Sequence, residues 1–200
     1  MTATSIPAPP AGAHRAMRAD ALRNYQRLLT AALESFTEHG ADDVSLEEIA
    51  RRAGVGIGTL YRHFPTRQAL VEAVYRDQVE GLRDKAQALL AADAADEALA
   101  EWLRALVEFG STKRSLVRSL MATTDKSAMI TACGTVMRAS AAALLERAQQ
   151  AGLVRPDADV EDMMRLVHAI SIMAAERPPA DEGQSGRLVD LVMDGLRYQN

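Results

Sequence analysis

Apolar residues recur at steps of three and four positions along most of the chain, which is the spacing of one face of an α-helix. The first such stripe precedes His39 and Gly40 and consists of Leu22, Tyr25, Leu29, Ala32, Leu33 and Phe36. Gly40 suits the end of this helix, because glycine adopts the left-handed backbone of a helix C-cap without steric cost. The pattern predicts a first helix that ends at about residue 39.

Two short helices joined by a tight turn are predicted next, over about residues 45–64. Ser45 and Glu48 have the spacing of a capping box, in which each side chain accepts a hydrogen bond from the backbone N–H of the other residue. Gly54 ends the first of these helices, where a turn needs a permissive backbone. The second short helix is predicted at about residues 56–63.

Pro65 marks the end of this second short helix. Proline disfavours helical backbone at the residue before it, here Phe64. Thr66 then caps a longer helix that begins near Arg67. Two short helices on a tight turn form a helix-turn-helix, and we place the domain that contains it at residues 20–79.

Five further helices are predicted within a second domain at residues 80–200. Their approximate ranges are 97–109, 113–122, 126–151, 160–175 and 185–198. Gly110 is interpreted as the break between the first two of them. The chain is therefore expected to be all-α, with nine helices.

Composition supports this fold class. Aromatic residues make up 4% of the 200 positions, and the helix formers Ala, Leu, Arg, Glu and Met dominate. The start of the chain contains three prolines, so residues 1–19 are predicted to form a disordered arm. No apolar stretch reaches the ~18 residues of a membrane-spanning helix, so no membrane contact is expected.

Charge and cysteine content exclude several kinds of site. The formal net charge is −4, so the whole-chain charge gives no sign of nucleic-acid binding. The single cysteine, Cys133, cannot form an intrachain disulfide, and no His/Cys cluster has the spacing of a metal site. We expect a cytoplasmic protein without metal or cofactor, and we assign no function to Cys133.

The second short helix has the composition of a helix that reads DNA. A helix in the major groove, which is about 12 Å wide, needs short or polar side chains on its outer face. Leu60 and Phe64 are four residues apart and can pack inward, which leaves outside Ile57, Gly58, Thr59, Tyr61, Arg62 and His63. In an arbitrary helical protein such residues are more often plain surface, so this pattern alone leaves both interpretations open.

The string SLEEIARRAGVGIGTLYRHFPTRQAL, at residues 45–70, resembles the signature of the TetR family of bacterial transcriptional regulators. The resemblance extends over residues 20–79, and beyond them it consists of the helix count and the run AGLVRPDADVEDMMRL. It implies three amino-terminal helices that bind DNA and a fourth that links them to a ligand-binding and dimerisation domain. It also implies a dimer that binds a partly palindromic operator.

Carried over to this sequence, the resemblance implies DNA contacts by Thr59, Tyr61 and His63. Arg67 stands where the family usually has a lysine that reaches a phosphate, and Ser45 is a second candidate for a phosphate contact. Arg62 is either a base reader or a solvated charge. The candidate DNA-binding residues are Ser45, Gly56, Ile57, Gly58, Thr59, Tyr61, Arg62, His63 and Arg67.

Residues 15–67 hold eight arginines against seven acidic residues, so the charges of this domain must be segregated if it binds DNA. We expect two groups, with Arg15, Arg18, Arg23, Arg62 and Arg67 toward DNA and Asp42, Asp43, Glu47 and Glu48 elsewhere.

The second domain offers candidates for an apolar ligand pocket. They are mainly methionine and aromatic residues, whose side chains suit an irregular cavity: Trp102, Phe109, Met121, Met129, Met137 and His168. Each of them taken singly is more often an ordinary core residue, and the resemblance implies a pocket among these helices.

The last two helices are apolar on more than one side, so each must bury a second face. This pattern predicts a homodimer through the last two helices. The expected function is a sequence-specific DNA-binding regulator, a repressor released by a small-molecule effector. The alternatives are a constitutive regulator, a helical enzyme and a protein-interaction module. The enzyme has little support, because the four histidines are scattered and no phosphate-binding glycine loop is present.

Overall fold

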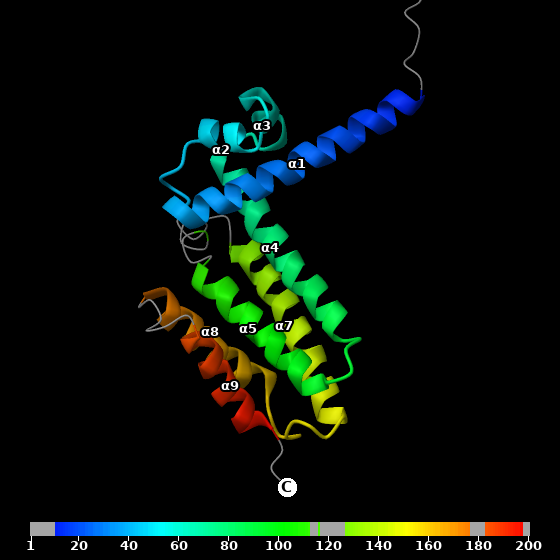
Figure 1. Cartoon of the computed structure of the whole chain (residues 1–200), viewed down its shortest axis with the longest axis vertical. Coiled ribbons are helices and arrows are strands. Elements are labelled where there is room, and N and C mark those ends of the chain that lie inside the picture. The colour runs from blue at the N-terminus through cyan, green and yellow to red at the C-terminus, as the bar shows by residue number, and fades with distance from the viewer. Residues whose placement is uncertain (1–10, 113–115, 117–126, 177–182, 198–200) are drawn as a thin grey trace, which may run out of the picture. The chain divides into compact units, whose positions relative to one another are not determined.

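The computed structural model describes residues 11–112, 116, 127–176 and 183–197. These residues form eight helices and no strand, apart from one isolated bridge between Val154 and Arg197 (Figure 1). The predicted all-α class is therefore confirmed. Contacts between residues divide the chain into two compact units, 1–70 and 71–200.

The first unit contains α1 (Ala11–His39), α2 (Leu46–Arg52) and α3 (Ile57–His63), together with the start of α4 (Arg67–Leu89). Its core is formed by apolar side chains that are almost fully buried: Leu28, Leu29, Ala32, Phe36, Ile49, Leu60, Phe64 and Leu70. Of the apolar stripe predicted on the first helix, Leu29, Ala32 and Phe36 lie in this core, whereas Leu22 is 68% exposed.

The helix ends in this unit follow local signals in the sequence. Gly40 and Gly54 have φ angles of +91° and +66°, which residues with a Cβ rarely adopt. Ser45 Oγ accepts a hydrogen bond of 3.1 Å from the Glu48 N–H, and Thr66 Oγ1 accepts one of 3.1 Å from the Ala69 N–H. Both predicted N-caps are therefore present.

Two details of this unit differ from the sequence prediction. The first helix begins at Ala11, so the predicted arm of residues 1–19 is helical from that position. The last proline of the segment is Pro10, and the alanine-rich sequence that follows favours a helix. The capping box is only half formed as predicted, because the Glu48 carboxylate is hydrogen-bonded to Arg51.

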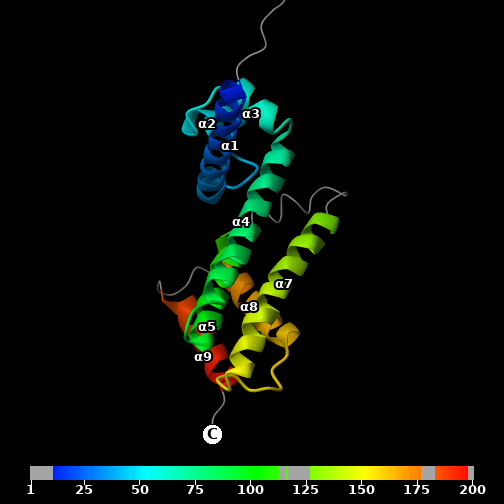
Figure 2. The ribbon, with the colours of Figure 1, turned by 90° about the vertical axis from the view of Figure 1, so that its right-hand side faces the viewer.

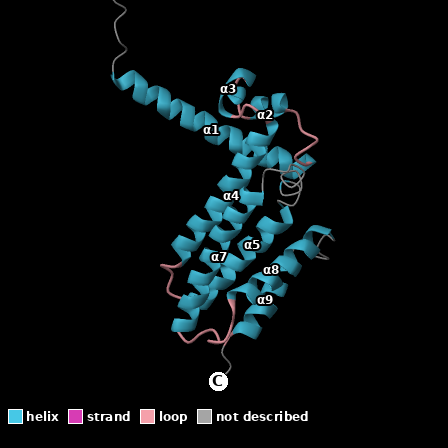
Figure 3. Ribbon diagram, turned by 180° about the vertical axis from the view of Figure 1, so that it is seen from behind, coloured by secondary structure: helices cyan, strands magenta, loops and turns pink. Residues whose placement is uncertain are grey.

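The second unit contains the rest of α4 with α5 (Ala95–Thr112), α7 (Ser127–Gln150), α8 (Val160–Glu176) and α9 (Gln184–Leu196). α5 packs against α7, α8 and α9, and it lies among them in the two views of Figures 2 and 3. Its core includes Trp102, which is fully buried and whose Nε1–H donates a hydrogen bond of 2.9 Å to the Leu82 carbonyl.

Four of the five helices predicted for this part of the chain are confirmed with ends within three residues of those observed. The fifth, at 113–122, lies outside the described residues except for Leu116, which is helical and buried. Gly110 is not a break, since α5 continues through it to Thr112. Within the described residues, no helix combines the length and apolar character needed to cross a membrane.

Candidate functional site

The outer face of α3 is exposed, and its inner face anchors it. Leu60 is fully buried and Phe64, at the C-cap, is 2% exposed, so these two side chains hold α3 on the first unit. Tyr61 and Arg62 are exposed, and Ile57 is 37% exposed. Leu60 and Phe64 are buried as the four-residue spacing predicts, whereas Thr59 and His63, which were expected on the outer face, are half-buried.

Two glycines flatten this exposed face. A Cβ added at Gly56 or Gly58 would meet no atom within 4 Å, so neither glycine is needed for packing inside the chain. Gly58 lies within α3, where glycine costs about 1 kcal/mol relative to alanine. Neither internal packing nor helix propensity therefore accounts for glycine at this position.

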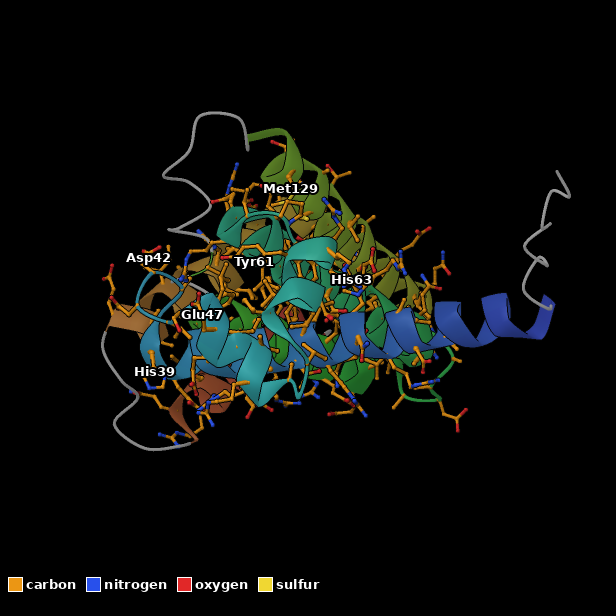
Figure 4. All side chains as sticks on the ribbon, turned by 90° about the horizontal axis from the view of Figure 1, so that it is seen from above. His39, Asp42, Glu47, Tyr61, His63 and Met129 are labelled. Atoms are coloured by element: carbon orange, nitrogen blue, oxygen red, sulfur yellow. The ribbon has the colours of Figure 1, made fainter. Side chains whose placement is uncertain are left out.

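His63 has a more structural place than the sequence indicates. Its ring lies edge-on to that of Tyr25 on α1, with centroids 5.8 Å apart, and the Tyr25 and Phe64 rings are 5.2 Å apart. His63 is half-buried, whereas Tyr61 projects from the opposite side of α3 (Figure 4). His63 therefore helps to hold α3 on α1 and leaves Tyr61 as the more accessible aromatic side chain.

The arginines of α2 are engaged in ion pairs. Arg51 donates hydrogen bonds of 3.0 and 2.6 Å to the Glu48 carboxylate, and Arg52 donates one of 2.6 Å to Glu38. These hydrogen bonds from Arg51 and Arg52 lower the pKa of Glu48 and of Glu38, respectively. In the described part of the chain no acidic side chain pairs with Arg62, so its charge is available at the α3 surface.

Arg67, the first residue of α4, connects this helix to the loop between α1 and α2. Its guanidinium donates hydrogen bonds to the carbonyls of Ala41, at 2.9 Å, and Val44. The side chain is half-buried, and Ser45 follows directly after the second carbonyl. Arg67 therefore holds the loop that precedes α2. From the sequence, only a phosphate contact was expected for this residue. The sequence gives no signal for the contact with the loop, because the two carbonyls lie 26 and 23 residues away.

The other charged residues of this unit differ in their surroundings. Arg23 is ion-paired with Asp20 on the exposed surface of α1, so its charge is offset locally. Asp42 and Glu47 are exposed and belong to the α1–α2 connection and to α2 (Figure 4). The side chains of Arg15 and Arg18 are not among those that the structure describes.

The second unit contains an apolar cavity of about 480 Å³ that is partly open to solvent. α4, α5, α7 and α8 all contribute to its wall, which consists of Tyr75, Leu106, Phe109, Gly110, Ile130, Gly134, Met137, Met164, Val167, His168, Ser171 and Ile172. A volume of this size falls in the range of small-molecule sites. The described residues contain no cluster of side chains able to hold a metal ion.

Three of the predicted pocket residues line this cavity: Phe109, Met137 and His168. Trp102 is instead part of the core, and Met129 is a half-buried residue of α7 that is absent from the cavity wall. Met121 lies outside the described residues. Trp102 is better explained as packing because its only polar atom is hydrogen-bonded to a carbonyl.

Sequence reasoning included the exposed His168 but missed the two buried polar side chains of the cavity. Tyr75 is only 3% exposed, and burial raises the pKa of its hydroxyl to about 12. Ser171 is 4% exposed and donates a hydrogen bond of 2.9 Å to the Val167 carbonyl of its own helix. The one available signal was Gly110, since α5 and α8 approach so closely there that a Cβ would lie 2.6 Å from the Ser171 Cβ.

Within the described residues, helices α8 and α9 carry large apolar side chains that are exposed. Leu166, Ile172 and Met173 on α8 are 54%, 39% and 50% exposed, and Leu191 on α9 is 67% exposed. The two helices pack against each other. Their opposite faces belong to the core, through Met163, Val167, Val189 and Met193.

Two family models match the chain. Residues 28–74 match the bacterial regulatory proteins of the tetR family, and residues 94–198 match the C-terminal domain of SbtR-like transcriptional regulators. The second match alone covers more than half of the chain. The chain belongs to the TetR family of transcriptional regulators.

Solved structures of similar length share the fold of this TetR-family regulator. A TetR transcriptional regulator from Streptomyces coelicolor is 37% identical, with a TM-score of 0.75 over 88% of this chain and 99% of that chain. A TetR transcription regulatory protein from Mycobacterium vanbaalenii is 39% identical, with a TM-score of 0.75 over 91% and 99%.

A curated relative, an HTH-type transcriptional regulator of Staphylococcus aureus, is 44% identical over 54 residues. That match spans 27% of this chain and 29% of the relative. Membership of a family of transcription factors sets aside the enzyme that the sequence left open. It also identifies α2 and α3 as the helix-turn-helix of the TetR-family regulator.

Proposed function

We propose that this TetR-family regulator is a homodimeric repressor that binds a partly palindromic operator and is released by a small-molecule effector. The observation that carries the DNA-binding part is the exposed face of α3, where two glycines serve no internal packing and Arg62 has no acidic partner among the described residues. A recognition helix needs this combination of a low profile and hydrogen-bond donors.

The candidate DNA contacts divide into two groups. Thr59, Tyr61 and Arg62 lie on α3 with donors that can reach base edges in the major groove. Ser45 is exposed at the N-terminus of α2, where its hydroxyl remains able to donate to a phosphate while its oxygen caps the helix. His63 and Arg67 contribute chiefly by positioning α3 and the loop before α2.

The uncovered apolar residues of α8 and α9 support a homodimer. Leu166, Met173 and Leu191 are each at least half exposed on helices whose other faces are core. A two-fold arrangement buries the same surface on both copies and presents two recognition helices about one DNA turn apart, or a simple multiple of it.

Release by an effector requires two states with different affinities for the ligand. The cavity of the second unit is the candidate effector site. One helix, α4, begins with Arg67, which holds the loop before α2, and contributes Tyr75 to the cavity wall. A ligand that favours one position of α4 would therefore shift the placement of α3.

The solved structure of AibR in complex with isovaleryl coenzyme A and operator DNA has the same fold, with a TM-score of 0.60 at 18% identity. This likeness is one of fold alone. It supports the proposal only in that a protein of this fold binds both a small molecule and operator DNA, and it does not bear on release.

The test is fluorescence anisotropy of a labelled duplex from the DNA upstream of the gene, titrated with the full chain at two salt concentrations beside a scrambled duplex. Selective binding that weakens with salt is expected, because displacement of counterions from phosphates opposes binding at high salt. Equal, weak binding to this duplex, to scrambled DNA and to every duplex selected from a genomic library would contradict the proposal.

A pair of arginine variants separates base or phosphate contact from general charge. Arg62→Ala is expected to weaken operator binding roughly 5- to 100-fold. Arg83→Ala removes the same charge from an exposed position on α4 that is paired with Asp84, and it should leave operator affinity unchanged. Equal losses in both variants would reject α3 as the recognition helix.

The constitutive alternative differs only in the effector. It predicts selective operator binding that no small molecule alters. Repeating the anisotropy titration in the presence of compounds that occupy the cavity distinguishes the two.

A further inference from the structure

The cavity of the second unit is polar at only a few points. Of its described wall residues none is Asp, Glu, Lys or Arg, and the hydrogen-bonding side chains are Tyr75, His168 and Ser171. His168 is exposed, whereas Tyr75 and Ser171 are buried. A ligand inside this cavity therefore meets an apolar wall with two buried hydroxyl groups.

These two hydroxyl groups are not equivalent. Ser171 already uses its hydrogen in a bond to the Val167 carbonyl, so its oxygen can only accept from a ligand. The Tyr75 hydroxyl makes no hydrogen bond with another residue in the described part of the chain, although the residue is only 3% exposed. A tyrosine hydroxyl that is buried normally has a partner, and its absence needs an explanation.

The Tyr75 ring is held in place on the cavity side. It packs against Phe109 with centroids 5.7 Å apart, and both residues line the cavity. Burial keeps this hydroxyl protonated far above neutral pH, so it is a hydrogen-bond donor without charge. A neutral donor in an apolar cavity fits an oxygen acceptor of a neutral ligand.

We propose that the effector is an uncharged, largely apolar molecule with an oxygen acceptor, such as a ketone, that receives a hydrogen bond from the Tyr75 hydroxyl. This inference rests on the proposed effector function of the cavity and names the class of ligand. A carboxylate or phosphate beside the Tyr75 hydroxyl would lose hydration, and the described wall offers it no Lys or Arg, which is unfavourable.

The test compares four probes that share one ring system. They are naphthalene, 2-acetylnaphthalene, 2-naphthoate and 2-(aminomethyl)naphthalene, titrated by calorimetry into the full-length protein without DNA. The ketone is expected to bind about 3- to 10-fold more tightly than naphthalene, which corresponds to one net hydrogen bond. The carboxylate and the amine should bind more weakly than naphthalene.

Two tyrosine variants make the test specific. Tyr75→Phe should abolish the preference for the ketone over naphthalene and leave naphthalene binding within about twofold, because the cavity keeps its shape. Tyr61→Phe removes a hydroxyl from the surface of α3 and should keep the preference in full. A circular dichroism melt of each variant confirms that it folds.

Three results would overturn the inference: tightest binding by 2-naphthoate, a ketone preference that survives Tyr75→Phe, or no binding by any of the four probes. Operator binding is measured separately by anisotropy with the same protein. Failure of the probe series with intact operator binding rejects the ligand class and leaves the DNA-binding proposal standing. Failure of operator binding together with the expected result in the probe series rejects the DNA-binding proposal and leaves the ligand class of the cavity standing.

Discussion

Gly58 shows how one residue separates the requirements of folding from those of function. It lies inside α3, where alanine would be more favourable, and the space around its missing side chain is empty. Stability alone would therefore select alanine at this position. The glycine is explained if DNA comes close to the helix backbone.

Gly58→Ala should consequently raise stability and weaken operator binding. We expect the free energy of unfolding to rise by about 0.5–1 kcal/mol, because alanine has the higher helix propensity. Operator affinity should fall, since the new methyl group stands on the face that meets the groove. Urea denaturation and anisotropy measure the two effects, and a variant that is more stable and binds equally well would show that DNA does not approach this residue.

Tyr75 makes the stability of the folded chain depend on pH in the alkaline range. Burial raises its pKa to about 12, above the ordinary value of about 10 for tyrosine. Between these values the Tyr75 hydroxyl loses its proton in the unfolded chain and keeps it in the folded chain. The free energy of unfolding is therefore unaffected by this group below pH 10 and falls as the pH rises toward 12. The loss reaches roughly 2–3 kcal/mol.

The measurement is the urea midpoint of the wild type and of Tyr75→Phe at pH 8, 9, 10 and 11. The difference between the two proteins removes the contribution of lysines and other tyrosines. We expect the wild type to lose stability relative to the variant above pH 10. Parallel curves over this range would mean that the Tyr75 hydroxyl is in contact with water.

At the scale of the helices, the sequence predicts what local chemistry determines. The ends of α1, α2 and α3 follow from Gly40, Ser45, Gly54 and Pro65, since caps and turns depend on a few consecutive residues. The exposed face of α3 follows from the four-residue spacing of the apolar residues on its inner face. Such features are readable without knowing what the helix packs against.

Contacts between distant segments are not readable in this way. Arg67 was expected at a phosphate, and its bonds to two loop carbonyls depend on how α4 meets the α1–α2 connection. Tyr75 was missed because its burial depends on which face of α4 meets α5. Gly110 was taken for a helix break. The reason for a glycine at this position is the close approach of Ser171, which lies about sixty residues later in the sequence.

The close contact of α5 and α8 at Gly110 is open to a direct test. An added Cβ would lie 2.6 Å from the Ser171 Cβ and 2.8 Å from its Oγ, so Gly110→Ala forces the helices apart. We expect a loss of about 1–3 kcal/mol in the free energy of unfolding. In the background of Ser171→Gly the clash is absent, and the same change should instead stabilise by about 0.5–1 kcal/mol.

Urea denaturation of the four proteins, at one protein concentration, gives the coupling between the two sites. The reversal of sign is the feature that identifies a steric cause. If Gly110→Ala destabilises equally in both backgrounds, the glycine serves the cavity or the backbone and not the helix contact.

At the scale of the whole molecule, DNA recognition and dimerisation are expected to depend on each other. One copy presents one α3, and a helix of seven residues reads only a few base pairs. Selective binding to a longer site therefore needs two copies held at a fixed spacing. The apolar residues left exposed on α8 and α9 are the surface that we expect to hold them.

Leu191→Glu places a charge on this surface, at a side chain that is 67% exposed in the single chain. Burial of an unpaired carboxylate in a dimer is strongly unfavourable, so the variant should sediment as a monomer. Leu22→Glu is the matched control, because Leu22 is 68% exposed on α1 and should have no part in the dimer. Dimers in both variants would place the interface elsewhere.

The monomer also makes a prediction for DNA binding. Each copy neutralises its own phosphates, so the dependence of log affinity on log salt should be about half as steep for Leu191→Glu as for the wild type. Its preference for the operator over scrambled DNA should fall more sharply, because each half-site contributes separately to selectivity. A monomeric variant that keeps the full salt slope and the full preference would mean that one α3 is sufficient, and the two-fold operator would then have no physical basis.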